Sequence, residues 1–503
     1  MKDLFHAPLF VLEMANNHMG DVEHGLRVIR EFAAICREFP FRCAFKMQYR
    51  HLDSLIHPDF VGRNDIKYIK RFSETRLSRD DTRRLVAEIK AQGFLAMCTP
   101  FDNASVETIL EDGFDILKIA SCSFTDWPLW ERVVQADLPI IASTAGAALA
   151  DMDKVVTFLS NRKKTFAVMH CVGEYPTPLE TLQLNQIDLL KARYPQVPIG
   201  YSTHEDPHLT LPVVAAVAKG AMIFEKHVGV ATDVYPLNAY SGSPAQIQAW
   251  LQAAQTALTL CGVTGERTPP TPAEAASLFS LRRGVFLRHA VHAGDRLTDQ
   301  DVFFAIPTQD GHVTANDWSK YHHYFATEDL PAGAPLLTSA SRCLDTRDTV
   351  WNVVRQVKDL LKRGNIVVPG CAQLEISHHY GLDRVHEVGI TMITVVNREY
   401  CKKLIVVLPG QSHPPQYHKQ KEETFHVLHG SLHLTLDGDS QSYGPGAVIV
   451  VGRGVVHSFD SRDGAVFEEI SSTHQAGDSF YLDPKIAENP QRKTFLNYWL
   501  DHA

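Results

Sequence analysis

Two histidines, His204 and His227, have a setting that suits metal binding. Each follows a short apolar run, and a helix-like segment separates them, so both side chains stand at the ends of consecutive predicted strands. Neutral imidazoles at the ends of neighbouring parallel strands can share one metal ion. A single histidine at a strand end is more often a hydrogen-bonded structural residue. The pair, rather than either residue alone, therefore predicts a metal site.

Three lysines, Lys46, Lys118 and Lys226, each interrupt a predicted apolar strand. A lysine in such a position is usually held by an internal salt bridge, because a buried cation needs a counter-charge. Three of them converging on one face of a sheet indicate a second source of negative charge, namely an anionic substrate. Lysines combined with serine and threonine hydroxyls suit a small molecule that carries both a phosphate and a carboxylate.

The elements that must position these residues form a repeating pattern from Leu9 to about Leu260. Eight apolar runs alternate with segments of helical period, which is typical of parallel strands covered by helices. The runs span 9–15, 43–48, 94–100, 116–121, 139–144, 165–171, 198–203 and 222–228, and the helical segments include 21–37, 78–91, 103–112, 127–136, 208–219 and 244–260. Eight units in about 250 residues predict a (β/α)8 TIM barrel of the α/β class, with its site at the carboxyl ends of the strands. A doubly wound open sheet is the alternative, but no GxGxxG follows any strand.

Composition excludes several classes of function. The chain has 503 residues, is 45% hydrophobic and 21% charged, and carries a net charge of −9, which is typical of a soluble protein of several domains. Without a Lys/Arg tract it is not expected to bind nucleic acid, and no apolar run approaches the roughly 20 residues of a membrane span. The N-terminus lacks a signal-peptide pattern. Nine cysteines without CxxC pairs indicate reduced thiols and a cytoplasmic location.

Several stretches of the first half resemble the sialic acid (N-acetylneuraminate) synthase family. They are "EMANNHMGD" (13–21), "FKMQ" (45–48), "CTPFD" (98–102), "LKIASCSFTDWPL" (117–129), "IASTAG" (141–146), "HCVGEYPTPLETLQLNQI" (170–187), "IGYSTHE" (199–205) and "FEKHV" (224–228), in order and at matching spacing. The resemblance implies a barrel over 1–264 and a transferase that forms a carbon–carbon bond. Such an enzyme joins phosphoenolpyruvate to an open-chain aldose, such as N-acetylmannosamine or a modified hexose, and gives a 2-keto-3-deoxy sugar acid and phosphate.

The resemblance also implies residue roles. Phosphoenolpyruvate would be held by Lys46, Gln48, Thr99, Lys118, Ser121, Ser143 and Ser202, and the sugar by Tyr175, Glu225 and Asn238. Glu225 is alternatively a partner for Lys226. Glu13 would move protons, and His204 and His227 would bind a divalent metal ion, Mn2+. Asn238 stands where the family has an aspartate, and Gly173 where it has Asn or Ser, so acceptor recognition is expected to differ.

After a linker at 265–277, residues 278–345 resemble the small antifreeze-like (SAF, β-clip) domain that follows the barrel in this family. In the family this domain reaches over the partner subunit's barrel, which implies a domain-swapped homodimer. Ile306 replaces an arginine that contacts the acceptor in the family. N-acetylmannosamine itself is therefore a doubtful acceptor.

The last part, 350–503, has short alternating strands and glycine-centred turns and resembles an all-β cupin barrel. His418, Glu423 and His457 have the spacing of a cupin metal site, which suits a second divalent metal ion, with Gln416 in place of the usual histidine. Lys421 matches a residue of sugar isomerases of the D-lyxose isomerase type. Three interpretations stay open. The cupin is a metal-dependent isomerase, or a non-catalytic sugar-binding or dimerising module, or the whole chain is a sugar-binding regulatory protein.

Overall fold

The computed structural model describes residues 4–5, 7–202, 204–475 and 477–500. The chain divides into two compact units, Met1–Thr268 and Pro269–Ala503. Within the described residues no helix has the length and hydrophobicity needed to cross a membrane.

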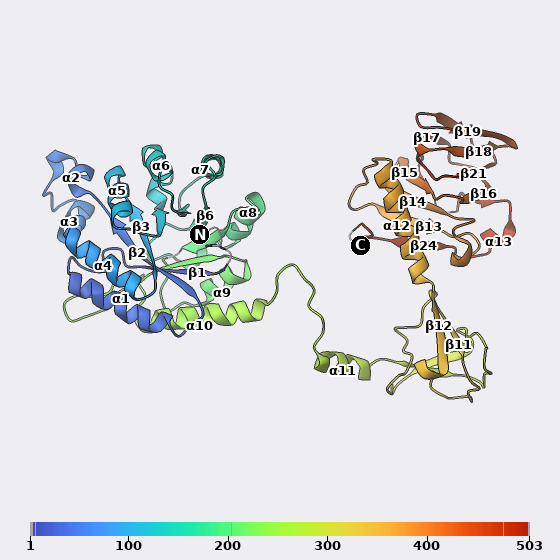
Figure 1. Cartoon of the computed structure of the whole chain (residues 1–503), viewed down its shortest axis with the longest axis horizontal. Coiled ribbons are helices and arrows are strands. Elements are labelled where there is room, and N and C mark those ends of the chain that lie inside the picture. The colour runs from blue at the N-terminus through green and yellow to red at the C-terminus, as the bar shows by residue number, and fades with distance from the viewer. Residues whose placement is uncertain (1–3, 6, 203, 476, 501–503) are drawn as a thin grey trace. The chain divides into compact units, whose positions relative to one another are not determined.

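The first unit is a closed barrel of eight parallel strands in sequential order, because β1 pairs with both β2 and β8 (Figure 1). The strands are β1 (Leu9–Glu13), β2 (Arg42–Tyr49), β3 (Leu95–Pro100), β4 (Ile116–Ile119), β5 (Ile140–Ser143), β6 (Phe166–Cys171), β7 (Ile199–Ser202) and β8 (Ile223–His227). Each overlaps one of the eight predicted runs, so the predicted barrel is confirmed. The predicted end of the seventh run, Thr203, lies outside the described residues.

Helices surround the strands (Figure 1). They are α1 (Val22–Cys36), α2 (Leu52–Leu55), α3 (Lys67–Glu74), α4 (Arg79–Ala91), α5 (Asn103–Glu111), α6 (Trp127–Val133), α7 (Leu149–Asn161), α8 (Asn185–Arg193), α9 (Leu211–Ala218) and α10 (Pro244–Cys261). Side chains that cap the first turn fix where two of these helices begin. Asp21 caps α1 by accepting from Glu23 N and His24 N, and Ser243 and Gln246 form a capping box at α10. Sequence analysis did not identify α2, α3, α7 and α8.

Alternation along each strand separates two hydrophobic cores. Leu9 and Val11 of β1 point into the barrel with Met97 and Ile223, whereas Phe10 and Leu12 pack between strands and helices. The next inward position of β1 is Glu13, at the carboxyl end. The inward positions of β8 change from apolar to polar in the same way, from Ile223 through Glu225 to His227. Side chains that point inward therefore build a packed floor first and a polar site above it.

His18 couples the barrel's stability to pH. It is buried, and its Nδ1 accepts a hydrogen bond from Gly20 N at 3.1 Å, so the folded state holds it neutral. Burial and nearby Arg71 lower its pKa to about 4. Because the folded pKa is depressed, the unfolded chain takes up a proton first as pH falls below about 6.5, and stability is lost between that pH and about 4.

We therefore expect His18 to contribute about 2 kcal/mol less to the free energy of unfolding at pH 5 than at pH 7.5. Urea unfolding of the wild-type chain and of His18→Gln at both pH values measures this contribution. The variant should show a smaller loss on acidification, and the exposed His57→Gln serves as control. An identical pH dependence in wild type and His18→Gln would contradict the assignment.

The second unit begins with a helix. The expected linker at 265–277 contains the start of α11 (Pro272–Ser280), which Thr271 caps. Next comes a small β-rich part with β9 (Gly284–Leu287), β10 (Val302–Ala305), β11 (His322–Ala326) and β12 (Ser341–Asp345), which has a hydrophobic core of its own. It contacts the last part of the chain directly, because Tyr321 Oη lies 3.1 Å from Thr494 Oγ1.

Two antiparallel sheets form most of the last part, after the amphipathic helix α12 (Arg347–Arg363). One sheet has the order β20-β17-β22-β15-β14-β13-β24 and the other β19-β18-β21-β16-β23. Their bounds are β13 (Gln373–Ser377), β14 (Ile390–Asn397), β15 (Tyr400–Val407), β16 (Ser412–Tyr417), β17 (Glu423–Gly430), β18 (Leu432–Leu436), β19 (Asp439–Tyr443), β20 (Val448–Val451), β21 (His457–Asp460), β22 (Ala465–Ser472), β23 (Phe480–Tyr481) and β24 (Lys493–Leu496). The predicted all-β cupin architecture is confirmed.

Candidate functional site

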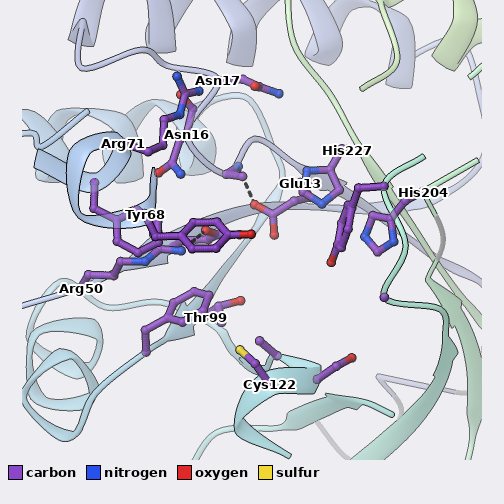
Figure 2. A pocket seen from close by; sticks show the side chains of 18 of the residues that line it. Glu13, Asn16, Asn17, Arg50, Tyr68, Arg71, Thr99, Cys122, His204 and His227 are labelled. Carbon is purple, nitrogen blue, oxygen red and sulfur yellow. Dashed lines mark hydrogen bonds between the residues drawn. The ribbon is translucent and has the colours of Figure 1, made fainter. Parts of the chain in front are cut away.

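A cavity of about 2020 Å3 opens at the carboxyl ends of the barrel strands. Every residue predicted for the barrel site lines it. These residues are Glu13, Lys46, Gln48, Thr99, Lys118, Ser121, Ser143, Tyr175, Ser202, His204, Glu225, His227 and Asn238. Figure 2 shows Glu13 near His227 and His204, with Thr99 of β3 and Cys122 of the turn after β4 lower in that view. The structure thus brings the predicted set together; the role of each residue stays a prediction.

The deepest polar layer is a buried ion-pair network. Lys46 Nζ lies 2.5 Å from Glu13 Oε2 and 2.8 Å from Glu225 Oε1, and Lys118 Nζ donates to Glu225 Oε2 at 2.8 Å. Burial lowers the pKa of Lys46 to about 7, an effect that Glu225 opposes. Although burial favours the neutral acid, Lys118 and Lys46 hold the pKa of Glu225 far below its usual range. The network is charged and internally compensated.

Lys226 does not take part in this network, so the prediction that three lysines converge is wrong for it. Its Nζ donates to Glu205 Oε1 at 2.7 Å, and both side chains are buried outside the cavity lining. The reason is the two-residue period of a strand. In β8, Glu225 and His227 point into the barrel, and Lys226 points outward beside Leu12. The alternative that Glu225 pairs with Lys226 is wrong for the same reason.

Two hydroxyls that line the cavity have no protein partner among the described residues. Thr99 Oγ1 and Ser143 Oγ are buried and form no hydrogen bond within the described part of the chain. Ser202 Oγ, by contrast, donates to Glu225 Oε1 at 3.3 Å, and Ser121 Oγ accepts from Ala145 N at 3.0 Å. A buried hydroxyl without a partner is costly unless a ligand or water completes it. These hydroxyls therefore fit a small oxyanion bound in the cavity that Lys46 and Lys118 also line.

His204 and His227 face each other with ring centroids 5.2 Å apart. His204 Nδ1 lies 3.0 Å from Val172 O, so this nitrogen donates to the carbonyl and Nε2 keeps its lone pair for a ligand. Burial lowers the pKa of His204 to about 4, and burial with nearby His204 and Lys46 lowers the pKa of His227 well below its usual value. Two neutral imidazoles that face each other fit a divalent metal ion that keeps open positions.

Aromatic and amide side chains line the region around the histidines. The Tyr175 ring lies 4.0 Å from the His204 ring, and Tyr240 lies 5.2 Å from the His227 ring, measured between centroids. Asn238 Nδ2 donates to Asn17 Oδ1 at 3.3 Å, while Asn238 Oδ1 accepts from Ser241 N at 2.9 Å. These groups offer hydrogen bonds and apolar surface but no charge, which suits the hydroxyl groups of a sugar.

Sequence analysis missed one wall of the cavity. The long connection from 50 to 77 between β2 and α4 contributes Arg50, Lys67, Tyr68, Lys70 and Arg71. Figure 2 shows Arg50, Tyr68 and Arg71 across the cavity from His204 and His227 in that view. Two features of the sequence could have identified this wall: the length of the connection, and its basic run "KYIKRF" (67–72).

The last part of the chain contains the predicted histidine–glutamate cluster. His418, Glu423 and His457 each offer a ligand atom within 4.8 Å of the others, and all three are buried. His418 Nδ1 and His457 Nδ1 donate to the backbone carbonyls of Asp478 and Val455, so both Nε2 atoms face Glu423, at 3.4 and 3.5 Å. This arrangement fits a divalent metal ion.

The surroundings of this cluster are tight. Gln416 Nε2 lies 3.3 Å from His457 Nε2, and Lys421 Nζ contacts Glu423 as well as Glu469. The cavity beside the cluster has a volume of only about 30 Å3. That volume accommodates about one water molecule, not a sugar.

Comparisons with known proteins agree with this geometry. Residues 43–264 match the NeuB family, and residues 403–470 match the cupin domain family. A crystal structure of a Chromobacterium violaceum protein named for spore coat polysaccharide biosynthesis is 53% identical, with a TM-score of 0.66. The match covers 67% of this chain and 99% of that one.

Curated relatives are more distant. An uncharacterised protein of Methanocaldococcus jannaschii is 28% identical over 60% of this chain and 85% of its own length. N,N'-diacetyllegionaminic acid synthase of Campylobacter jejuni is 27% identical over 44% of this chain and 66% of its own length. N-acetylneuraminate-9-phosphate synthase of Drosophila melanogaster is 29% identical over 43% of this chain, a match that spans 59% of that enzyme. The closed barrel, the residues gathered at its mouth and these relatives lead to one conclusion: the chain belongs to the NeuB family.

Proposed function

We propose that the barrel condenses phosphoenolpyruvate with the aldehyde of an open-chain aldose and releases a 2-keto-3-deoxy sugar acid and inorganic phosphate. One observation carries the proposal. A single cavity holds two buried lysines, two unpartnered hydroxyls and two neutral imidazoles. The lysines and hydroxyls suit a small polyanion, and the imidazoles suit the metal ion that such a condensation uses.

The roles of the chain's own residues follow from their contacts. Lys46 and Lys118 bind the charged groups of phosphoenolpyruvate, with Thr99 and Ser143 donating to its oxygens. Gln48, Ser121 and Ser202 complete this pocket. His204 and His227 hold a divalent ion, Mn2+, which when bound supplies Lewis-acid polarisation of the aldehyde oxygen. Tyr175, Glu225 and Asn238, which line the same cavity, orient the sugar in this proposal.

Glu13 is the proton-transfer group in this proposal. A bond forms between C3 of phosphoenolpyruvate and the aldehyde carbon, whose oxygen takes up a proton. Water then adds to C2 and loses one proton, and the C2–O bond to phosphate breaks as the new C2 hydroxyl passes its remaining proton to the departing phosphate. Glu13, between Lys46 and the histidines, is placed to accept the proton of the water and return one to the alkoxide.

The test is a condensation assay on the full chain with Mn2+. Phosphoenolpyruvate and each of a panel of six-carbon aldoses, with and without 2-acetamido or 6-deoxy groups, are incubated with the protein. We expect phosphate and a keto acid to form in equal amounts with at least one acceptor. Phosphate release without keto acid, or no reaction across the panel, would overturn the proposal.

For the cupin we propose a metal-holding module without sugar turnover. The cavity of about 30 Å3 and the contact of Lys421 with Glu423 support this interpretation over a sugar isomerase. Together with the barrel site, the chain is then expected to hold two metal ions. A cytoplasmic, domain-swapped homodimer with an antifreeze-like domain at 278–345 stays part of the proposal.

The metal content of variants tests the cupin site. We expect about two metal ions per wild-type chain and about one in His457→Ala, since removing one of three ligands weakens binding strongly. Elemental analysis after dialysis measures the content. His433→Ala on β18, whose ring contacts Ser442 instead, serves as matched control. Equal metal content in wild type and His457→Ala would count against the site.

A further inference from the structure

The interior of the cupin contains a group of lysines that the proposed metal ion does not use. We define the cupin lysine cluster as Lys403 of β15, Lys421 just before β17, and Lys493 of β24. Lys403 and Lys421 are buried, and Lys493 is half-buried. On β15, Lys403 alternates with Ile405, which belongs to the hydrophobic core between the two sheets, so Lys403 points inward as well.

Carboxylates neutralise two of these three lysines. Lys493 Nζ lies 2.6 Å from Glu375 Oε1, and Lys421 Nζ lies 2.8 Å from Glu469 Oε1. Lys403 is different. It stands directly opposite Glu469 in the β15–β22 ladder, but Glu469 pairs with Lys421 instead. Only 3% of Lys403 is exposed, and it forms no hydrogen bond or ion pair within the described part of the chain.

The surroundings of Lys403 are electropositive and rich in free donors. Burial, followed by the three lysines of the cluster, lowers the pKa of the nearby His474 to about 3. Nη1 of Arg492 and Oγ of Ser377 are buried and have no hydrogen-bond partner among the described residues. Ser377 lies opposite Lys493 in the β13–β24 ladder. A buried cation and unpartnered donors are unfavourable unless a ligand supplies negative charge and acceptor atoms.

The acids of the same interior limit the charge of such a ligand. Glu469 and Glu423 both contact Lys421, and they would repel a doubly charged phosphate. A carboxylate carries a single charge, and its two oxygens accept from several donors. None of the three lysines lines the cavity of about 30 Å3 beside the metal cluster, so that volume does not limit the size of the ligand.

We propose that the cupin binds an organic acid whose carboxylate is the counter-charge of Lys403 within the cupin lysine cluster. Because Lys421 also contacts Glu423, the bound acid lies next to the candidate metal ligands. A small keto acid and a sugar acid both present this carboxylate. The inference does not depend on the proposed condensation, so either can fail while the other stands.

Calorimetric titration of the full chain with Mn2+ tests the inference. Pyruvate is compared with pyruvamide, and gluconate with gluconamide, so that the members of each pair differ by one negative charge. We expect the acid of at least one pair to bind at least tenfold more tightly than its amide. A preference seen only with pyruvate assigns the site to small acids, and one seen only with gluconate assigns it to sugar acids. In Lys403→Met, the affinity for the preferred acid should fall at least tenfold.

Matched variants locate the binding site. Lys402→Met is the control on the same strand, since Lys402 alternates with Lys403 and lies 2.6 Å from Glu468. Lys118→Met weakens the anion site of the barrel and should leave binding to the cupin unchanged. Replacing an uncompensated buried charge by an apolar side chain should not destabilise the ligand-free chain. Thermal unfolding of Lys403→Met should therefore have a midpoint no lower than that of the wild type.

Several results would overturn the inference. One is equal affinity for acid and amide in both pairs, and another is a preference that survives in Lys403→Met. Loss of the preference in Lys118→Met, with Lys403→Met unaffected, would place the acid in the barrel. Inorganic phosphate that binds through Lys403 more tightly than either acid would replace the carboxylate. A lower unfolding midpoint for Lys403→Met would make Lys403 a structural residue.

Discussion

His204→Ala and His227→Ala are each expected to lower the rate of keto acid formation by at least about 1000-fold. The site offers two imidazoles to a metal ion, and losing either leaves a single protein nitrogen, which does not retain a divalent ion in competition with water. The Lewis acid contributes several kcal/mol to stabilising the transition state, and each 1.36 kcal/mol corresponds to a factor of ten. Initial rates of product formation at saturating Mn2+ measure the effect.

Metal content separates the loss of the ion from a general structural defect. Each alanine variant should lose about one ion per chain and keep the unfolding transition of the wild type. His208→Ala is the control, since His208 is exposed and contacts Asp206 and Gln246 outside the cavity. Wild-type rates in either His204→Ala or His227→Ala would refute the assignment of the barrel metal.

Glu13→Gln should lower kcat by about 100- to 10,000-fold, which is the usual contribution of a general acid–base group. The amide keeps the size and most contacts of Glu13, including acceptance from Ala15 N, but it cannot take up a proton. Because Lys46 retains Glu225 as a partner, the KM for phosphoenolpyruvate should change far less than kcat. Steady-state kinetics with phosphoenolpyruvate varied at fixed acceptor give both constants.

Comparing the change in kcat with the change in KM distinguishes a proton-transfer role for Glu13 from a structural one. A purely structural role for Glu13 would raise KM by displacing Lys46 and leave kcat nearly unchanged. Glu23→Gln, on the exposed face of α1 where Glu23 pairs with Arg84, is expected to behave as wild type. An unchanged kcat in Glu13→Gln would remove Glu13 from the proton-transfer role.

Much of the barrel site could be predicted because one physical rule generates it. Inward positions of parallel strands are two residues apart, and the last of them lie at the carboxyl end. Glu13 follows Leu9 and Val11 in this way, and His227 follows Ile223 and Glu225. The same rule, applied strictly, excludes Lys226, which sequence analysis had grouped with Lys46 and Lys118 by residue type instead of by parity.

Other features depend on tertiary contacts that no local pattern encodes. Arg50 and Arg71 belong to a connection that lines the cavity, and packing sets its path, as in the stacking of Arg50 between Phe72 and Phe101. In the cupin, the spacing of His418, Glu423 and His457 gave the cluster correctly. The closure of the cavity, by contrast, results from side chains of several strands, including Met392, Phe425 and Phe467. The volume enclosed by such residues cannot be read from their order in the chain.

The buried ion-pair network of the barrel affects how fast a charged substrate can bind. Because Lys46 and Lys118 are already paired with Glu13 and Glu225, their field reaches little beyond the barrel mouth. An approaching anion first meets Lys67 and Lys70, which are exposed. Under the proposed function, capture of the substrate from solution and its final binding therefore fall to different residues. Added salt should slow the encounter, because it screens the exposed Lys67 and Lys70. The later step, in which the substrate carboxylate replaces a glutamate as the partner of Lys46 or Lys118, is buried, so ionic strength should hardly alter its rate.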